Sequence, residues 1–114
     1  MESNTRVVIT GIGLVSPAGQ GMEQTWSSVQ SGTSGIGPIT LFDPTEHPVR
    51  IAGEVSDFDP SAHISPKELK RMDRFIKFAL VAALDAVADA GIEVPVTDPE
   101  RVGVLVGVGL GGLQ

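Results

Sequence analysis

The stretch that decides the fold runs from Arg6 to Pro17 and reads RVVITGIGLVSP. Its apolar, β-branched run ends in two glycines, Gly11 and Gly13, which is typical of a buried central strand that gives way to a tight turn in an α/β sheet. A dinucleotide-binding turn needs a third glycine three places after the second, and Ser16 stands there, followed by Pro17. The motif therefore predicts a strand and a turn without the phosphate-binding pattern.

A second stretch of the same kind lies near the other end of the sequence. Residues Val102 to Val108 predict another buried strand, and Gly107, Gly109 and Gly112 then match the spacing G-x-G-x-x-G. Two interpretations remain open: a nucleotide-binding turn, or glycines that simply let two backbones pass closely. Since the sequence stops at the mouth of this strand-to-helix connection, we expect it to be the first portion of a larger domain.

Composition narrows the class of protein. The 114 residues are 41% apolar and 19% charged, with a mean hydropathy of +0.17, as in an ordinary globular domain. No cysteine is present, which excludes a disulfide scaffold and a thiol nucleophile within these residues. The net charge of −6 argues against a general nucleic-acid binder. Without a signal-peptide pattern or a membrane-length apolar run, we expect a cytoplasmic protein.

The middle of the sequence predicts a helix and then a long ordered loop. Met22, Trp26 and Val29 recur at helical spacing, with Gly32 as the stop and Trp26 expected in the core. From residue 33 to 64 glycines and prolines punctuate the chain, and only residues 50–55 read as a strand.

The clearest element is a helix that begins at Ser65. Ser65, Pro66 and Glu68 form a capping box, and Gly91 supplies the stop, so the pattern predicts one long helix between them. Many of its apolar residues are small, which indicates close approach to another backbone. The expected apolar face comprises Met72, Phe75, Ile76, Ala79, Ala83, Ala86, Val87 and Ala90. The order of strands and helices predicts a layered α/β sheet.

The histidines and the paired aspartates form no pattern that indicates catalysis or metal binding. His47 and His63 lie in loops without a partner at metal-ligand spacing, so both are expected to be surface histidines. Asp57 and Asp59 flank Phe58 and lack a third ligand, which favours a solvated loop. No metal site is predicted.

Positive charge is concentrated on the start of the long helix. Five of the eight basic residues lie there, at spacings that place them on one helical face: Lys67, Lys70, Arg71, Arg74 and Lys77. This face is either simply solvated or the docking surface for an acidic or phosphate-bearing partner.

Seven segments, taken in order, span essentially everything after Thr5: RVVITGIGLVSPAG (6–19), TW (25–26), SGTSGI (31–36), LFD (41–43), KELKRMDRFIKFAL (67–80), DAGI (89–92) and RVGVLVGVGLGG (101–112). Together they resemble the N-terminal part of the β-ketoacyl-acyl carrier protein synthases, above all the type II enzymes of bacterial fatty acid synthesis.

The resemblance implies a thiolase-like α-β-α-β-α layered sandwich, of which residues 1–114 would form an incomplete first portion. It implies a homodimeric acyltransferase without metal or organic cofactor, acting on thioesters of acyl carrier protein. The family's nucleophilic cysteine and its two assisting histidines and lysine match no residue of this sequence. What transfers is the basic triad, Lys67, Lys70 and Arg71, as carrier-protein dock, and Leu110 as a wall of the acyl pocket. A non-catalytic, chain-length-factor-like partner and a nucleotide-binding module are the alternatives.

Overall fold

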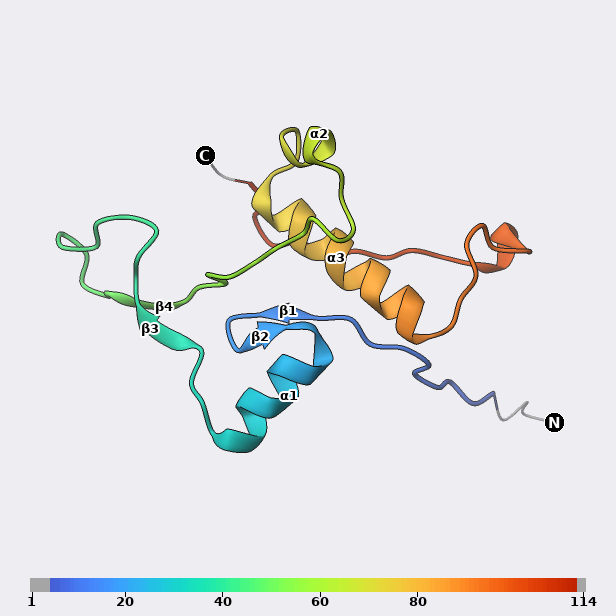
Figure 1. The fold of residues 1–114 in the computed structure, drawn as a ribbon, viewed down its shortest axis with the longest axis horizontal. Helices are drawn as coiled ribbons and strands as arrows, with labels where there is room; N and C mark the ends of the chain where they lie inside the picture. The colour runs from blue at the N-terminus through green and yellow to red at the C-terminus, as the bar shows by residue number, and fades with distance from the viewer. Residues whose placement is uncertain (1–4, 113–114) are drawn as a thin grey trace.

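The computed structural model describes residues 5–112 and contains helices joined to two small sheets (Figure 1). In chain order the elements are β1 (Val15–Ser16), β2 (Gly19–Gln20), α1 (Gly21–Ser31), β3 (Ile36–Pro38), β4 (Ile51–Gly53), α2 (Pro66–Leu69), α3 (Arg74–Asp89) and the 3₁₀ turn η1 (Pro99–Arg101). Strands β1 and β2 pair antiparallel, and so do β3 and β4.

The first hairpin leads directly into α1. Ser16 pairs with Gly19 across a two-residue turn, and the Ser16 hydroxyl accepts a hydrogen bond from the Ala18 amide. Helix α1 ends at Gly32, whose left-handed backbone (φ 68°) confirms the predicted stop. Trp26, expected in the core, is 57% exposed, because α1 meets the rest of residues 5–112 mainly through the β1–β2 turn.

The second hairpin lies in the loop region. Strand β4 falls within the predicted 50–55 segment, whereas β3 was not predicted, because Gly37 and Pro38 lower its strand propensity. The Glu54 carboxylate fastens the loop between the strands by accepting hydrogen bonds from the amides of Thr40 and Leu41 and from the Thr40 hydroxyl.

The prediction of one continuous helix between Ser65 and Gly91 is wrong, because two helices occupy this stretch. The chain forms α2 and then turns, and α3 starts afresh after Asp73, whose extended backbone (φ −67°, ψ 160°) cannot continue a helix. Both predicted ends are confirmed. The Ser65–Glu68 capping box is formed, and Gly91 adopts φ 64° just after the last turn.

Helix α3 carries a close contact with the Gly11–Gly13 segment. A Cβ on Gly11 would lie 2.5 Å from the Ala90 amide nitrogen, and one on Gly13 would lie 2.5 Å from that of Ala86. The Asp89 carboxylate accepts a hydrogen bond of 2.8 Å from the Ile12 amide. The alanines of α3 therefore admit another backbone, as predicted, and the glycines of the opening motif are required by this contact.

The two predicted buried strands are wrong for residues 5–112. Val7 is 92% exposed and Leu105 is 99% exposed, and no neighbouring strand pairs with either segment within this range. Strand pairing requires a partner backbone, which an apolar sequence alone does not supply. Among the described residues, only Ile64 and Val81 are buried hydrophobics.

The chain is extended for its length. Its radius of gyration is 17.6 Å, whereas about 13 Å is usual for a compact domain of roughly this size. Its accessible surface of 9489 Å² likewise exceeds the roughly 6,000 Å² expected from its mass. No helix among residues 5–112 combines the length and apolar character needed to span a membrane.

Candidate functional site

The basic triad occupies the short stretch that joins α2 to α3. Lys67 lies within α2, Lys70 caps its C-terminus and Arg71 lies in the following turn, and all three are exposed. Within residues 5–112 no acidic side chain comes within ion-pair distance of them. The triad therefore presents three positive charges to solvent, on a turn set at one end of α3 (Figure 1).

Arg74 does not belong to this surface. Its guanidinium donates a hydrogen bond to the Val55 carbonyl and lies 5.1 Å from the centre of the Phe78 ring. Phe78 in turn packs edge-on against Phe58, with ring centres 4.7 Å apart. Arg74 is thus a cross-link between α3 and the loop that precedes α2, and Lys77 is half-buried on α3. The predicted single face of five basic residues is wrong, because the chain turns between Leu69 and Arg74.

A second link holds the loop before the triad. His63 Nε2 lies 2.9 Å from Asp85 Oδ1, so the histidine donates to a carboxylate on α3. The next residue, Ile64, is 3% exposed. The sequence predicted His63 to be a surface histidine and did not predict its partner. Asp85 lies 22 residues away and meets His63 only because α3 folds back against this loop. His47 lies in the loop between β3 and β4, edge-on to Phe42.

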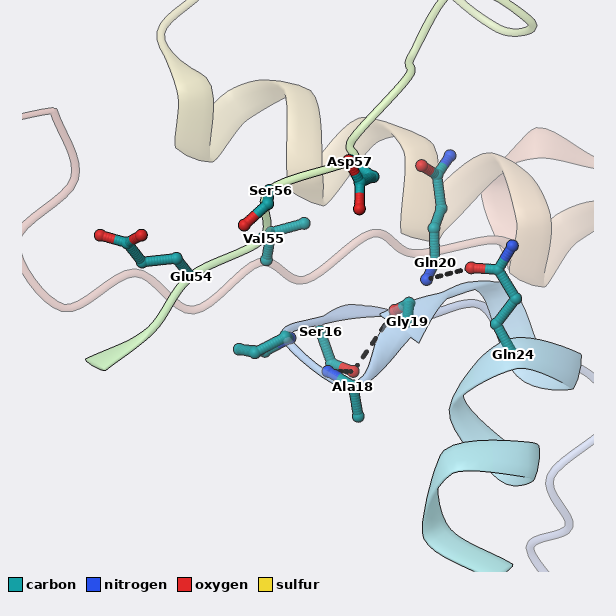
Figure 2. Close-up of a pocket in the computed structure, with 10 residues that line it drawn as sticks. Ser16, Ala18, Gly19, Gln20, Gln24, Glu54, Val55, Ser56 and Asp57 are labelled. Atoms are coloured by element: carbon teal, nitrogen blue, oxygen red, sulfur yellow. Dashed lines mark hydrogen bonds between the residues drawn. The ribbon is translucent and has the colours of Figure 1, made fainter. Parts of the chain in front are cut away.

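A hollow of about 260 Å³ lies between the β1–β2 turn and the segment after β4. Figure 2 shows the residues that line it. Much of its polar lining is already bonded: Ser16 within its turn, and the Gln24 side-chain oxygen to the Gln20 amide at 3.1 Å. Asp57 lines the hollow, whereas Asp59 accepts a hydrogen bond from the Ser61 amide. The two aspartates are not brought into one site, and residues 5–112 contain no cluster of three or more metal-ligating side chains.

Three carboxylates are held in their ionised form. The Thr45 hydroxyl lowers the pKa of Asp43, the Thr40 hydroxyl lowers the pKa of Glu54, and the Ser61 hydroxyl lowers the pKa of Asp59. Asp43 and Asp59 each fasten a turn within their own loop, and Glu54, which follows β4, fastens the start of the β3–β4 loop at Thr40. Their role is structural.

The glycine-rich segment from Gly107 to Gly112 lies beside a carboxylate in the described part of the chain. The would-be Cβ of Gly112 meets the Asp73 carboxylate, whose charge would repel a phosphate. The backbone at Gly111 and Gly112 instead passes close to Phe75. Leu110, predicted to line an acyl pocket, is 83% exposed and does not line the hollow shown in Figure 2.

Relatives of known activity match this chain over nearly its whole length. A 3-oxoacyl-acyl-carrier-protein synthase 2 from Staphylococcus aureus (strain COL) is 43% identical over 114 residues, which is 100% of this chain and 28% of the relative. The synthase 2 from Coxiella burnetii is 44% identical over 108 residues, 95% of this chain and 26% of the relative. The chain thus spans little more than a quarter of the length of the curated relatives it matches.

A solved structure also matches this chain in fold and sequence. The ishigamide ketosynthase/chain length factor superposes with a TM-score of 0.65 at 40% sequence identity, covering 75% of this chain and 21% of the other. This neighbour supports an α/β class for the chain. The model of the beta-ketoacyl synthase N-terminal domain matches residues 4–114, so the chain belongs to the beta-ketoacyl synthase family.

Proposed function

We propose that this chain is part of a 3-oxoacyl-acyl carrier protein synthase that elongates fatty acids. The complete protein condenses an acyl thioester with malonyl-carrier protein and releases carbon dioxide. The observation that carries the proposal is the 43% identity to a synthase 2 along the entire chain.

The chemistry assigned to the complete enzyme divides between this segment and the remainder. A thiol nucleophile has to accept the acyl group before the carbon–carbon bond forms, and these 114 residues contain no cysteine. The segment therefore supplies scaffold, carrier docking and part of the acyl pocket. The nucleophile belongs to the remainder of the complete protein.

Carrier docking is assigned to the basic triad. Acyl carrier protein is acidic, and three exposed cations without acidic partners in residues 5–112 form a complementary surface. Their main contribution is to the encounter rate, because each exposed ion pair is worth only about 0.2–1 kcal/mol. Leu110 is assigned to the acyl-pocket wall, which requires that its exposed side chain be covered in the complete enzyme.

The same proposal includes the architecture of the complete enzyme: a thiolase-like layered sandwich, a homodimer and a cytoplasmic location. The exposed apolar segments at Val7 and Leu105 agree with it, since they are the residues that a layered sheet would bury.

A second candidate is a non-catalytic chain-length-factor-like partner of a ketosynthase. It is favoured by one observation, the 40% identity to a neighbour described as a ketosynthase/chain length factor. Such a protein would share this segment and lack the nucleophile.

The two candidates are separated by incubating the complete protein with acyl-carrier protein and malonyl-carrier protein and measuring 3-oxoacyl-carrier product by mass spectrometry. A synthase becomes acylated on a cysteine and forms product, and it loses both when that cysteine is alkylated. A complete protein that dimerises with a ketosynthase but is never acylated would establish the partner role instead.

A further inference from the structure

The segment that carries Leu110 first becomes partly covered one residue later, at Gly111. Residues 101–110 are all exposed, and Leu110 itself is 83% exposed. Gly111 is half-buried and has a left-handed backbone (φ 62°), which glycine adopts without strain. Within residues 101–112 the chain therefore turns and meets a neighbour directly after Leu110.

That neighbour is the ring of Phe75. A Cβ added to Gly111 would lie 3.3 Å from Phe75 Cζ, and one added to Gly112 would lie 3.3 Å from Phe75 Cε1. Both distances are shorter than the 3.4 Å at which ordinary contact begins. The outer atoms of the ring thus fill the space that a side chain at either glycine would need, and they lie against the backbone that follows Leu110.

Phe75 reaches this place from the first turn of α3. The helix begins at Arg74, so Phe75 is its second residue. Phe78, three residues further along, is also half-buried, but it packs edge-on against Phe58 with ring centres 4.7 Å apart. The two phenylalanines of α3 therefore have different neighbours, and only their contacts distinguish them.

We propose that Phe75 is a positioning residue for the acyl-pocket wall: its ring supports the backbone after Leu110 and limits how far this wall can retreat from a long acyl chain. The proposal rests on the proposed role of Leu110 in the pocket wall and adds a residue that determines how firmly the wall is held. The role is indirect, because Phe75 acts through the position of Leu110.

A wall that is held in place limits primer length sharply. An acyl chain that is one two-carbon unit too long overpacks the end of a pocket, and the cost is high only where the wall cannot yield. Removing the outer atoms of the Phe75 ring leaves unfilled space beside Gly111 and Gly112, into which their backbone can move. Loss of these atoms should therefore admit longer primers, whereas Leu110→Phe should exclude them.

The test uses the complete protein and measures kcat/KM for acyl-carrier protein primers of increasing, even chain length. Phe75→Leu removes the ring atoms that meet the two glycines and keeps an apolar side chain. Phe78→Leu is the matched control, because it makes the same substitution on the same helix at a residue that packs against Phe58. Phe75→Met tests rescue, since an unbranched methionine fills most of the same space.

Phe75→Leu should lower the discrimination against the first primer beyond the wild-type limit by about tenfold, the lower end of what one methylene group is worth in a fitted pocket. Phe78→Leu and Phe75→Met should keep the wild-type limit. General destabilisation lowers the rate with every primer, so it cannot produce a relative gain that is confined to long primers.

Three results overturn the proposal in distinguishable ways. If no primer gives product, the synthase function is wrong and the role of Phe75 falls with it. If Leu110→Phe lowers the rate equally with all primers, the pocket-wall role of Leu110 is wrong and the role of Phe75 falls with that. If Leu110→Phe affects long primers alone but Phe75→Leu keeps the wild-type limit, only the role of Phe75 is wrong.

Discussion

Replacing Gly13 by alanine should be among the most damaging small changes in this segment. The new Cβ would lie 2.5 Å from the Ala86 amide nitrogen and closer still to the Ala82 carbonyl, whereas ordinary contact begins at 3.4 Å. Residues 11–13 must therefore move by at least about 0.9 Å, the difference between those two distances. Both obstructing atoms belong to the backbone of α3, which cannot yield by changing a rotamer.

The cost has two parts. Overpacking costs about 1–3 kcal/mol, and the displacement lengthens the 2.8 Å bond from Ile12 to Asp89, which adds about 1 kcal/mol. A loss of 1 kcal/mol lowers the melting temperature by about 2–4 °C in a protein of 150–250 residues and by less in a longer one. We expect Gly13→Ala to lower the melting temperature of the complete protein by about 3 °C or more, measured by calorimetry.

Gly37→Ala is the matched control. It makes the same change within β3, where nothing lies within 4 Å of the added Cβ and φ is not left-handed. A Gly13→Ala protein that melts at the wild-type temperature, or one that loses no more than Gly37→Ala, would refute the claim that this motif exists to lie against α3.

Three further outcomes are expected. Leu110→Phe in the complete enzyme should lower the rate with long acyl primers and spare short ones, because bulk added to a packed wall costs about 1–3 kcal/mol; an equal loss for all primers would make Leu110 structural. Hydrogen bonds from Thr40 hold the pKa of Glu54 below its ordinary value of 4.5. The ionised carboxylate therefore stabilises the β3–β4 loop above pH 4.5, and this stabilisation is lost as the pH falls through the lowered pKa. The protection factors of the Thr40 and Leu41 amides should therefore drop on acidification in wild type, and Glu54→Gln should show no such drop. The isolated 114-residue polypeptide should associate or melt without cooperativity, because residues such as Val7 and Leu105 are exposed, and a monodisperse monomer with a sharp melt would contradict this.

Local signals predicted the parts of the fold that local chemistry decides. The capping box at Ser65 and the glycine stops at Gly32 and Gly91 appear where the sequence placed them, because each depends on a few neighbouring residues. The alanines of α3 correctly predicted a close backbone neighbour. The break at Asp73 was missed, because helical periodicity continues across it and only the backbone angles reveal the turn.

The features that the sequence did not predict depend on contacts between residues far apart in the chain. The strands predicted at Val7 and Leu105 need neighbours that residues 5–112 do not provide. For the site, the sequence identified the basic triad but grouped Arg74 with it, since charge spacing does not show that a guanidinium turns toward Val55. The pairing of His63 with Asp85 likewise joins two elements and has no local pattern.

The most direct test of the central claim is the kinetics of the complete enzyme after Lys67, Lys70 and Arg71 are all reversed to glutamate. Arg101→Glu is the control, because it reverses an exposed charge on η1, at the other end of α3 from the triad (Figure 1). The triple variant should raise KM for acyl-carrier protein many-fold while keeping its melting temperature and its activity on small thioesters. About 1 M salt, where the Debye length is about 3 Å, should bring wild type toward the variant. Unchanged carrier kinetics with unchanged salt dependence would contradict the claim and leave the triad a solvated surface without a partner.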